Sequence, residues 1–355
     1  MSNKIIYCKS PLRLSLAGGG TDVEPFSSKF ESCVLNFTIN EFIEGSLKEL
    51  PPNDLLTQIS VMVATSSGFG AKNSNRVPSD FEVLLEQNLI AFYGNRIKQP
   101  IAITLSSPVS PGSGLGASSS MVLTAIHLLK VHLSEPVNPY LLAHEAFELE
   151  RNWMHLSGGF QDQYAAAFGG VLFLSRQTLK VQVEKLKVQH PFLRSLENSI
   201  LLIDLGISRS GETIIDKQIK NVHLEKFSTI SALIKQIAIA KEMRSAIIDQ
   251  NLPEVARLVQ EAWESKKDFT LEISNETINN TIKTLIDLGA IGVKVSGAGG
   301  GGHLLCILPE DSGVREKTIG YLRHSRLDYR KIRISGEGSS AWTLENGNRK
   351  SWRRF

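Results

Sequence analysis

The chain has 355 residues, of which 42% are hydrophobic and 21% are charged, and its formal net charge is +3. These values are typical of a globular protein of two domains, and the charge is too small to indicate nucleic-acid binding. The three cysteines form no C-x-x-C pair, which favours a reducing compartment and excludes the usual zinc site. Because no signal peptide or membrane-length apolar run is visible, we expect a cytoplasmic protein.

Hydrophobic patterns predict an α+β fold in two parts. The first part contains predicted strands, two helices and a hairpin, over residues 5–16, 32–47, 101–106, 121–133, 139–155 and 170–188. From residue 200 we expect a strand, three or four helical segments between 211 and 288, and two strands around a glycine run. The stretch near Pro191 has few periodic signals, so we place the boundary there, between domains 1–190 and 191–355.

The first of three glycine clusters lies near the N-terminus, where residues 10–22 read Ser-Pro-Leu-Arg-Leu-Ser-Leu-Ala-Gly-Gly-Gly-Thr-Asp. This pattern predicts a short strand that runs into a tight turn. The strand carries Arg13, and the turn carries Thr21 and Asp22.

The second cluster, Pro-Gly-Ser-Gly-Leu-Gly-Ala-Ser-Ser-Ser at residues 111–120, runs directly into a predicted helix. Glycines let the backbone pass close to a ligand, and the first helical turn presents N–H groups and the positive end of the helix dipole. The three serines add hydroxyls that can cap the helix or ligate a cation on the phosphates. The segment therefore predicts a site for nucleotide phosphates.

Three other interpretations of this loop are a P-loop, a dinucleotide-binding loop and a plain surface loop. No Gly-Lys pair occurs in the chain, which excludes a P-loop. Gly112, Gly114 and Ala117 fit the loose dinucleotide fingerprint, but a helix is predicted over 139–155, where that fold needs a second parallel strand. On these residues alone, a plain Gly/Ser surface loop before an ordinary helix stays open.

The third cluster lies between two apolar strands, where residues 297–302 read Gly-Ala-Gly-Gly-Gly-Gly. Each glycine adds chain entropy that folding must remove, so stability does not explain four in a row. A close approach of this backbone to a ligand or to another loop is the better explanation.

Together the clusters resemble, in order and spacing, the three motifs of the GHMP kinase superfamily. Pro111 and the run from Gly114 to Ser119 match the middle motif, P-x-x-x-G-L-G-[SA]-S-[SA], almost letter for letter. Residues 11–22 and 158–170 most resemble D-glycero-D-manno-heptose 7-phosphate kinases. The resemblance implies a two-domain α+β fold, with an N-terminal domain like ribosomal protein S5 domain 2, a ferredoxin-like C-terminal domain, and the site between them.

The resemblance also implies a reaction. A GHMP kinase of the heptose type uses ATP and Mg²⁺ to phosphorylate the anomeric C1 hydroxyl of a sugar phosphate, heptose 7-phosphate, to the 1,7-bisphosphate on the route to GDP-heptose for surface polysaccharides. Alternatives are a kinase for a free sugar of the fucose or galactose type, a mevalonate kinase, and a ligand sensor without activity. The joint presence of Asp162, Arg13, Glu150 and Ser118 argues against the sensor. No nucleic-acid or membrane partner is expected, and a homodimer stays open.

In the family the middle motif holds the ATP phosphates. This role falls here on Pro111, Gly112, Ser113, Gly114, Leu115, Gly116, Ala117, Ser118 and Ser119. The Mg²⁺-binding serine of relatives corresponds to Ser118, and the carboxylate partner corresponds to Glu150, followed by Arg151 as in mevalonate kinase-like members. Glu148 is the alternative ligand, and only one of the two can face the site, because residues two apart on a helix point to different sides. Asp162 lies twelve positions after Glu150, which implies a one-residue insertion relative to those members.

The resemblance assigns the catalytic base to Asp162, which leads into a run of small residues. An aspartate at a helix N-terminus can also be only a cap. Arg13 is expected beside it, because the family places a Lys or Arg there against the charge of the transferring phosphoryl group.

The acceptor is expected to contact Gly18, Gly19, Gly20, Thr21, Asp22, Gly159, Gly299 and Gly300. Asp22 corresponds to the sugar-binding aspartate of galactokinases, whereas Gly19 and Gly20 replace their Glu-His pair and leave room for a larger or phosphorylated acceptor. Arg209 follows a predicted strand and is a candidate for binding a sugar phosphate, although a surface arginine is the simpler interpretation.

Overall fold

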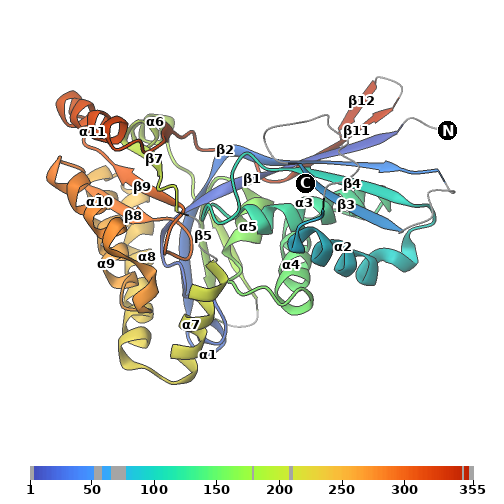
Figure 1. The fold of residues 1–355 in the computed structure, drawn as a ribbon, viewed down its shortest axis with the longest axis horizontal. Helices are drawn as coiled ribbons and strands as arrows, with labels where there is room; N and C mark the ends of the chain where they lie inside the picture. Colours follow the sequence, from blue (N-terminus) through green and yellow to red (C-terminus); the bar gives the residue numbers. More distant parts are fainter. Residues whose placement is uncertain are drawn as a thin grey trace.

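The computed structural model describes residues 4–51, 58–64, 77–177, 180–207 and 211–345, and the backbone of 348–351. Figure 1 shows two lobes side by side, one built on long strands and the other on a short sheet with several helices. Arg209, one of the predicted acceptor residues, lies outside the described residues.

The first lobe is built on a sheet for which eight strands are described, in the order β12-β11-β1-β2-β4-β3, with β5 beside β2 and β6 beside β5. Neighbouring strands are antiparallel except β3 and β4, which are parallel. The strands are β1 (Ile5–Ala17), β2 (Ser32–Glu49), β3 (Ile59–Ala64), β4 (Ile101–Ser106), β5 (Val171–Arg176), β6 (Gln182–Lys185), β11 (Ser340–Glu345) and β12 (Asn348–Ser351).

Strand β1 carries the first glycine cluster into the junction between the lobes. Its burial alternates up to Lys9 and is continuous from Ser10 onward. The register with β2 shifts between Pro11 and Arg13 and again between Ser15 and Ala17. Proline cannot donate to a ladder, and such bulges redirect the side chains that follow. The irregular half of β1 therefore presents Arg13 to the interior.

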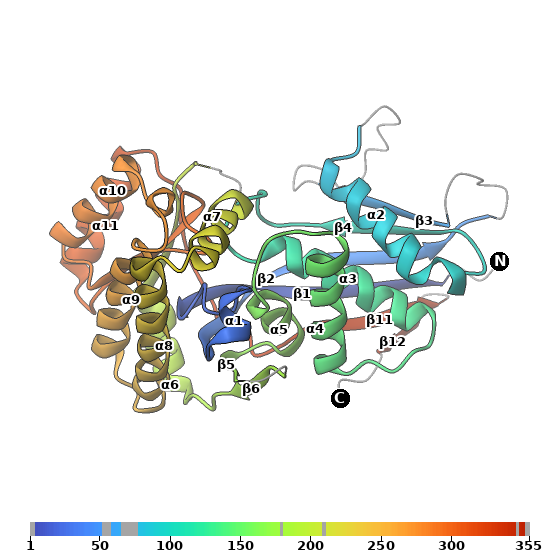
Figure 2. The ribbon, with the colours of Figure 1, turned by 90° about the horizontal axis from the view of Figure 1, so that it is seen from below.

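Helices cover one face of this sheet, as Figure 2 shows. The central one is α3 (Ala117–His132), which packs on β1 and β2 and is buried at every position from Ser119 to Val131. Around it lie α2 (Asp80–Tyr93), α4 (Pro139–Phe147) and α5 (Gln161–Phe168). The predicted helix over 139–155 changes at its end into a π-helical turn, Glu148–Trp153.

The second lobe contains a four-stranded antiparallel sheet in the order β10-β7-β9-β8. Its strands are β7 (Ile200–Asp204), β8 (Gly292–Val295), β9 (His303–Ile307) and β10 (Tyr329–Lys331). The helices of this half are α6 (His190–Ser199), α7 (Gly211–His223), α8 (Phe227–Ile248), α9 (Leu252–Lys266), α10 (Glu276–Asp287) and α11 (Ser312–His324), while the short α1 (Phe26–Lys29) follows β1. The third glycine cluster joins β8 to β9.

Two features differ from the sequence-based division at residue 190. Helix α6 occupies the stretch expected to have little regular structure. The predicted second domain, 191–355, includes β11 and β12, and β11 pairs with β1 in the larger sheet. This pairing covers an edge of β1 that would otherwise present free N–H and C=O groups.

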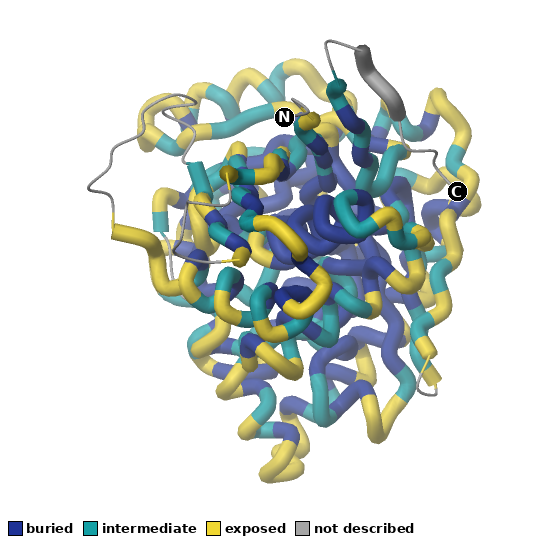
Figure 3. The backbone as a smooth tube through the Cα atoms, turned by 90° about the vertical axis from the view of Figure 1, so that its right-hand side faces the viewer, coloured by how far each residue is buried: buried dark blue, intermediate teal, exposed yellow. Residues whose placement is uncertain are grey.

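Buried segments run through the centre of the molecule and exposed ones lie at its rim (Figure 3). Among the described helices, none has the length and apolar character needed to cross a membrane.

Candidate active site

The loop at residues 111–116 connects β4 to α3 and has the features of a phosphate cradle. Gly112, Gly114 and Gly116 all have positive φ, and Gly116 stands at the N-cap of α3 with φ 77°. No side chain caps α3, so the N–H groups of its first turn are available to an anion. The predicted residues Pro111 to Ser119 are thus brought together at the start of a buried helix.

The third glycine cluster supports this cradle from behind. Ser296 Oγ donates to Gly114 O at 2.9 Å, and a Cβ on Gly297 would lie 2.6 Å from Gly114 Cα. A Cβ on Gly302 would come within 2.7 Å of Ser113 O. Only glycines permit this approach of two backbones, as the sequence predicted.

Arg13 and Asp162 meet at the mouth of the cradle. Arg13 Nε donates to Asp162 Oδ1 at 2.6 Å and Nη2 donates to Oδ2 at 2.8 Å, while Nη1 donates to Gly114 O at 2.6 Å. A Cβ on Gly116 would lie 3.4 Å from Asp162 Cγ. The guanidinium therefore fixes the carboxylate against the start of α3.

Asp22 joins the turn at residues 18–22 to α5. Its side chain is buried and accepts N–H groups of Gly20 and Gln161, both at 3.1 Å. Burial raises the pKa of Asp22, and the nearby charge of Asp162 raises it further. Gly159 lies against this carboxylate so closely that a Cβ there would collide with it. The turn and α5 thus form one unit.

The remaining residues of the turn have mainly structural contacts. Thr21 is fully buried, and its hydroxyl donates to Gly18 O at 2.8 Å and accepts the N–H of Cys33 at 3.2 Å. Gly18 has φ +80° and lies so close to Cys33 that a Cβ would collide with Cys33 O. The hydrogen bonds of the Thr21 hydroxyl tie the turn to β2, so this residue fixes the conformation of the turn.

Ser118 and Glu150 form a pair of oxygen donors beside the cradle. Ser118 Oγ donates to Glu150 Oε1 at 3.2 Å, and Gln163 Nε2 donates to Oε2 at 2.6 Å. Glu150 is 1% exposed. Glu148 instead accepts a hydrogen bond from Asn152 at 2.7 Å, so the two glutamates do point to different sides. The π-helical turn holds both, and such turns are frequent at functional sites.

The donor set of this pair fits Mg²⁺. The described residues contain no group of three His, Cys, Asp or Glu side chains suited to a metal. Mg²⁺ needs no such group, because one or two protein oxygens with phosphates and water complete its shell. The hydroxyl of Ser118, in the first turn of α3, and the carboxylate of Glu150 could supply these protein oxygens.

Gly299 and Gly300, which were predicted to contact the acceptor, lie against Ile273. Gly300 N donates to Ile273 O at 2.8 Å, and the atoms nearest to a Cβ on Gly299 also belong to Ile273. The two glycines thus attach the glycine loop to the 3₁₀ turn Leu271–Ile273. The bond to Ile273 O also gives the buried N–H of Gly300 an acceptor. The approach to the cradle is made by Gly297 and Gly302.

Several residues of the site had no role in the sequence analysis. Gln161 and Gln163 flank Asp162; the first binds Asp22 and the second binds Glu150. The signal in the sequence that could have identified them is their position on either side of Asp162. His303 donates or accepts at two points, Ser113 O at 2.9 Å and Arg330 Nη1 at 3.2 Å. Burial lowers the pKa of His303, so a neutral ring can donate to Ser113 O and accept from Arg330.

Comparison with known proteins shows the family of the chain. The family model of the GHMP kinases N terminal domain matches residues 83–170, and the model of the GHMP kinases C terminal domain matches residues 243–317. The D-glycero-alpha-D-manno-heptose 7-phosphate kinase of Campylobacter jejuni is 30% identical over 349 residues, which cover 96% of this chain and 100% of that protein. The chain therefore belongs to the GHMP kinase family, and it is an ATP-dependent kinase with the two-domain fold of that family.

Two further similarities extend over nearly the whole chain. The crystal structure of a D-glycero-D-manno-heptose 1-phosphate kinase from Bacteroides thetaiotaomicron superposes with a TM-score of 0.72 at 27% identity, covering 95% of this chain and 98% of that one. The bifunctional fucokinase/GDP-fucose pyrophosphorylase of Arabidopsis thaliana is 24% identical over 90% of this chain and 31% of its own length.

Proposed function

We propose that this sugar kinase phosphorylates the anomeric C1 hydroxyl of a sugar phosphate, D-glycero-D-manno-heptose 7-phosphate, on a route to GDP-heptose for surface polysaccharides. The observation that carries the proposal is the position of Asp162, which is held by Arg13 at the start of the cradle while Gln161, the residue before it, binds Asp22. The similarity to heptose phosphate kinases supports the choice of acceptor.

In this reaction Asp162 accepts the proton of the acceptor hydroxyl. The hydroxyl oxygen forms a bond to the γ-phosphorus of ATP, and the bond from that phosphorus to the β–γ bridging oxygen breaks to leave ADP. Arg13 orients the carboxylate through two hydrogen bonds, and its charge opposes that of the moving phosphoryl group. The N–H groups at the start of α3 bind the phosphates.

For the metal we propose Ser118 and Glu150 as the protein ligands. Their oxygens are 3.2 Å apart and come from two different helical segments beside the cradle. A bound Mg²⁺ would neutralise phosphate charge and orient the phosphates. Gln163 and Arg151 hold the Glu150 carboxylate in place, with Arg151 Nη1 at 3.4 Å from Oε1.

For the acceptor we propose the turn at residues 18–22 together with Gly159. Because Asp22 binds the N–H of Gln161, a sugar held by this turn lies next to Asp162. Arg209 is our candidate for the remote phosphate. A second phosphate would supply binding energy that aligns the hydroxyl with ATP, so an acceptor without it should lose turnover as well as affinity.

The experiment is a panel of acceptors assayed for ADP release by the full chain. It includes heptose 7-phosphate, free heptose, fucose, galactose and mevalonate. We expect the highest kcat/KM with heptose 7-phosphate. In Arg209→Ala the ratio of kcat/KM for heptose 7-phosphate to kcat/KM for free heptose should be smaller than in the wild type. Equal kcat/KM for heptose 7-phosphate and free heptose would overturn the assignment of a sugar-phosphate acceptor, but the assignment as a kinase would be unaffected.

A further inference from the structure

Lys266, the last residue of α9, extends from the second lobe to the glycine loop behind the cradle. The residue is only 7% exposed, and its Nζ donates to Gly297 O. Gly297 in turn lies against Gly114, whose carbonyl oxygen accepts Arg13 Nη1. A short chain of contacts therefore connects the ammonium group of Lys266 with the arginine that holds the base.

The charges around Lys266 come from four elements. Burial lowers the pKa of Lys266 to about 8, and the positive charge of Arg13 on β1 acts in the same direction. The carboxylates of Asp22 in the acceptor turn and Asp162 on α5 oppose this change. Lys294 on β8 is close enough for its own pKa to be lowered by Lys266. The ammonium thus lies within the field of both carboxylates that we place at the acceptor.

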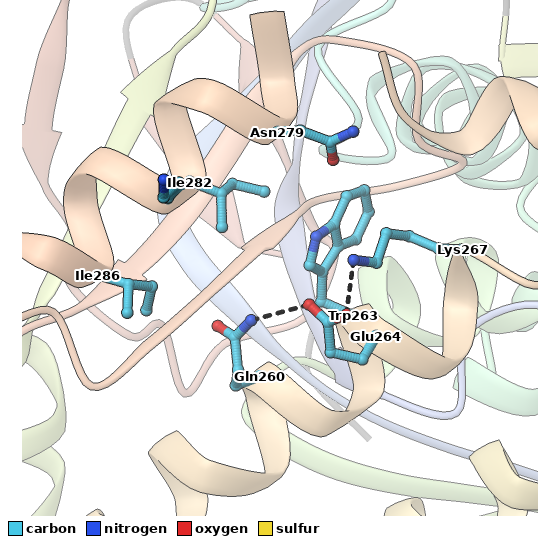
Figure 4. A pocket seen from close by; sticks show the side chains of 8 residues that line it. Gln260, Trp263, Glu264, Lys267, Asn279, Ile282 and Ile286 are labelled. Carbon is cyan, nitrogen blue, oxygen red and sulfur yellow. Dashed lines mark hydrogen bonds and ion pairs between the residues drawn. The ribbon is translucent and has the colours of Figure 1, made fainter. Parts of the chain in front are cut away.

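Neighbouring lysines have different surroundings. Lys267 follows Lys266 in sequence but faces the groove between α9 and α10, where it pairs with Glu264 (Figure 4). Lys294 is also buried, yet its Nζ donates to two carbonyl oxygens, Ser15 O at 2.9 Å and Leu16 O at 3.0 Å. Both lysines have structural partners that account for them, and they serve as controls.

The hydrogen bonds of Lys266 leave capacity for a ligand. An ammonium group has three donors. Within the described part of the chain Nζ has one acceptor, Gly297 O, so two donors stay available. A buried cation with free donors is costly unless an anion completes its shell. A phosphoryl group in transfer carries negative charge on three oxygens and is an anion of this kind.

We propose that Lys266 is the cation that the second lobe contributes to phosphoryl transfer, binding the migrating phosphoryl group together with Arg13. The proposal rests on the placement of Asp162 and Asp22 in the proposed function. It gives the second lobe a direct part in the chemistry, so that both lobes must be in contact for transfer to occur.

The first test compares Lys266→Ala, Lys294→Ala and Lys267→Ala in the full chain, with activity expressed per folded molecule. Whichever acceptor the wild type turns over is used, so an error in the heptose assignment leaves this test intact. We expect Lys266→Ala to lower kcat by roughly 10²–10³, as for loss of one transition-state donor, with KM for ATP nearly unchanged. Lys267→Ala should keep wild-type kcat, and Lys294→Ala should mainly lower the melting temperature.

Rescue separates a chemical from a structural role. Methylammonium added to Lys266→Ala should restore part of kcat in a saturable manner, and it should not act on Lys294→Ala. If Lys266→Ala loses thermal stability while its kcat per folded molecule stays within a few-fold of wild type, Lys266 is only a clamp on the glycine loop. Absence of rescue together with a raised KM for ATP would overturn the proposal in the same way.

A pH profile provides an independent measurement. Lys266 carries its charge below its pKa, so kcat/KM of the wild type should fall as the pH rises through about 8. The arginine of Lys266→Arg keeps its charge at all these pH values, so the alkaline decrease of kcat/KM should move to higher pH. An identical alkaline limb in wild type and an active Lys266→Arg would contradict the proposal.

Discussion

Arg13 and Asp162, which are 149 positions apart, form a two-point ion pair in which Nε and Nη2 of the arginine lie 2.6 and 2.8 Å from the two carboxylate oxygens. A planar guanidinium that binds both oxygens fixes the rotation of the carboxylate as well as its position. A third hydrogen bond, from Nη1 to Gly114 O, ties the guanidinium to the loop at residues 111–116, so the orientation of the carboxylate depends on that loop.

Replacing Asp162 with Asn should therefore keep the site assembled and remove the base. We expect kcat to fall by roughly 10²–10⁴, the usual size of general-base loss, while ATP affinity stays near that of wild type. Steady-state kinetics with nucleotide-binding titrations measure both quantities. Asp311→Asn, at the N-cap of α11, is the matched control, because asparagine caps a helix equally well. A kcat within a few-fold of wild type would show that Asp162 is not the base and serves only to hold Arg13, an outcome that a loose transition state permits.

The Mg²⁺ requirement separates the two glutamates at the π-helical turn. Ser118→Ala and Glu150→Gln should each raise the Mg²⁺ concentration that gives half-maximal activity, because the first removes an oxygen ligand and the second removes the negative charge of the carboxylate. Glu148→Gln should leave this concentration unchanged, since its carboxylate binds Asn152. Activity measured against free Mg²⁺ at fixed ATP decides between them. A shift for Glu148→Gln alone would reverse the assignment.

Alanine at Gly159 should disturb the acceptor side and spare the nucleotide side. The added Cβ would collide with the Asp22 carboxylate, which must then move away from Gln161. We expect KM for the acceptor to rise and kcat to fall, with KM for ATP little changed. Gly320→Ala is the control, because nothing lies within 4 Å of a Cβ there and the helix position favours alanine by about 1 kcal/mol. Equal effects on both substrates would point to general misfolding.

Acid should destabilise the protein in part through His127 of α3. Burial lowers the pKa of this histidine to about 4, and its Nδ1 lies 2.7 Å from Ser339 Oγ. The unfolded chain takes up this proton near pH 6.5, so the contribution is complete above that pH and is lost as the pH falls toward 4.

His127→Gln should consequently show a weaker decline of unfolding free energy between pH about 6.5 and about 4. Denaturant titrations at several pH values measure the slope. His144→Gln, at an exposed position of α4, should keep the wild-type slope. If the slopes of wild type and His127→Gln coincide, the buried ring does not control this part of the acid response.

Local sequence determined the parts of the site that depend on backbone conformation. The three glycine clusters could be read directly, because positive φ values and close backbone contacts leave glycine as the residue that fits. The strand at 101–106 was predicted with its observed bounds, and a strand was expected from residue 200, where β7 begins, because short apolar runs between turn signals are typical of buried strands. The family motif then identified Asp162 and Arg13 as candidates.

Tertiary structure decided which of these residues meet. Pairing of β11 with β1 joins segments more than 300 positions apart, and no local pattern encodes such a contact. Spacing predicted that Glu148 and Glu150 point to different sides, but the π-helical turn that holds them was not predicted, and their partners are known only from the folded structure. Lys266 lies far from every motif, and only the contact of its ammonium group with the glycine loop connects it to the site. Side-chain chemistry is local, whereas burial and charge neighbours are properties of the folded chain, and these determine what a lysine can do.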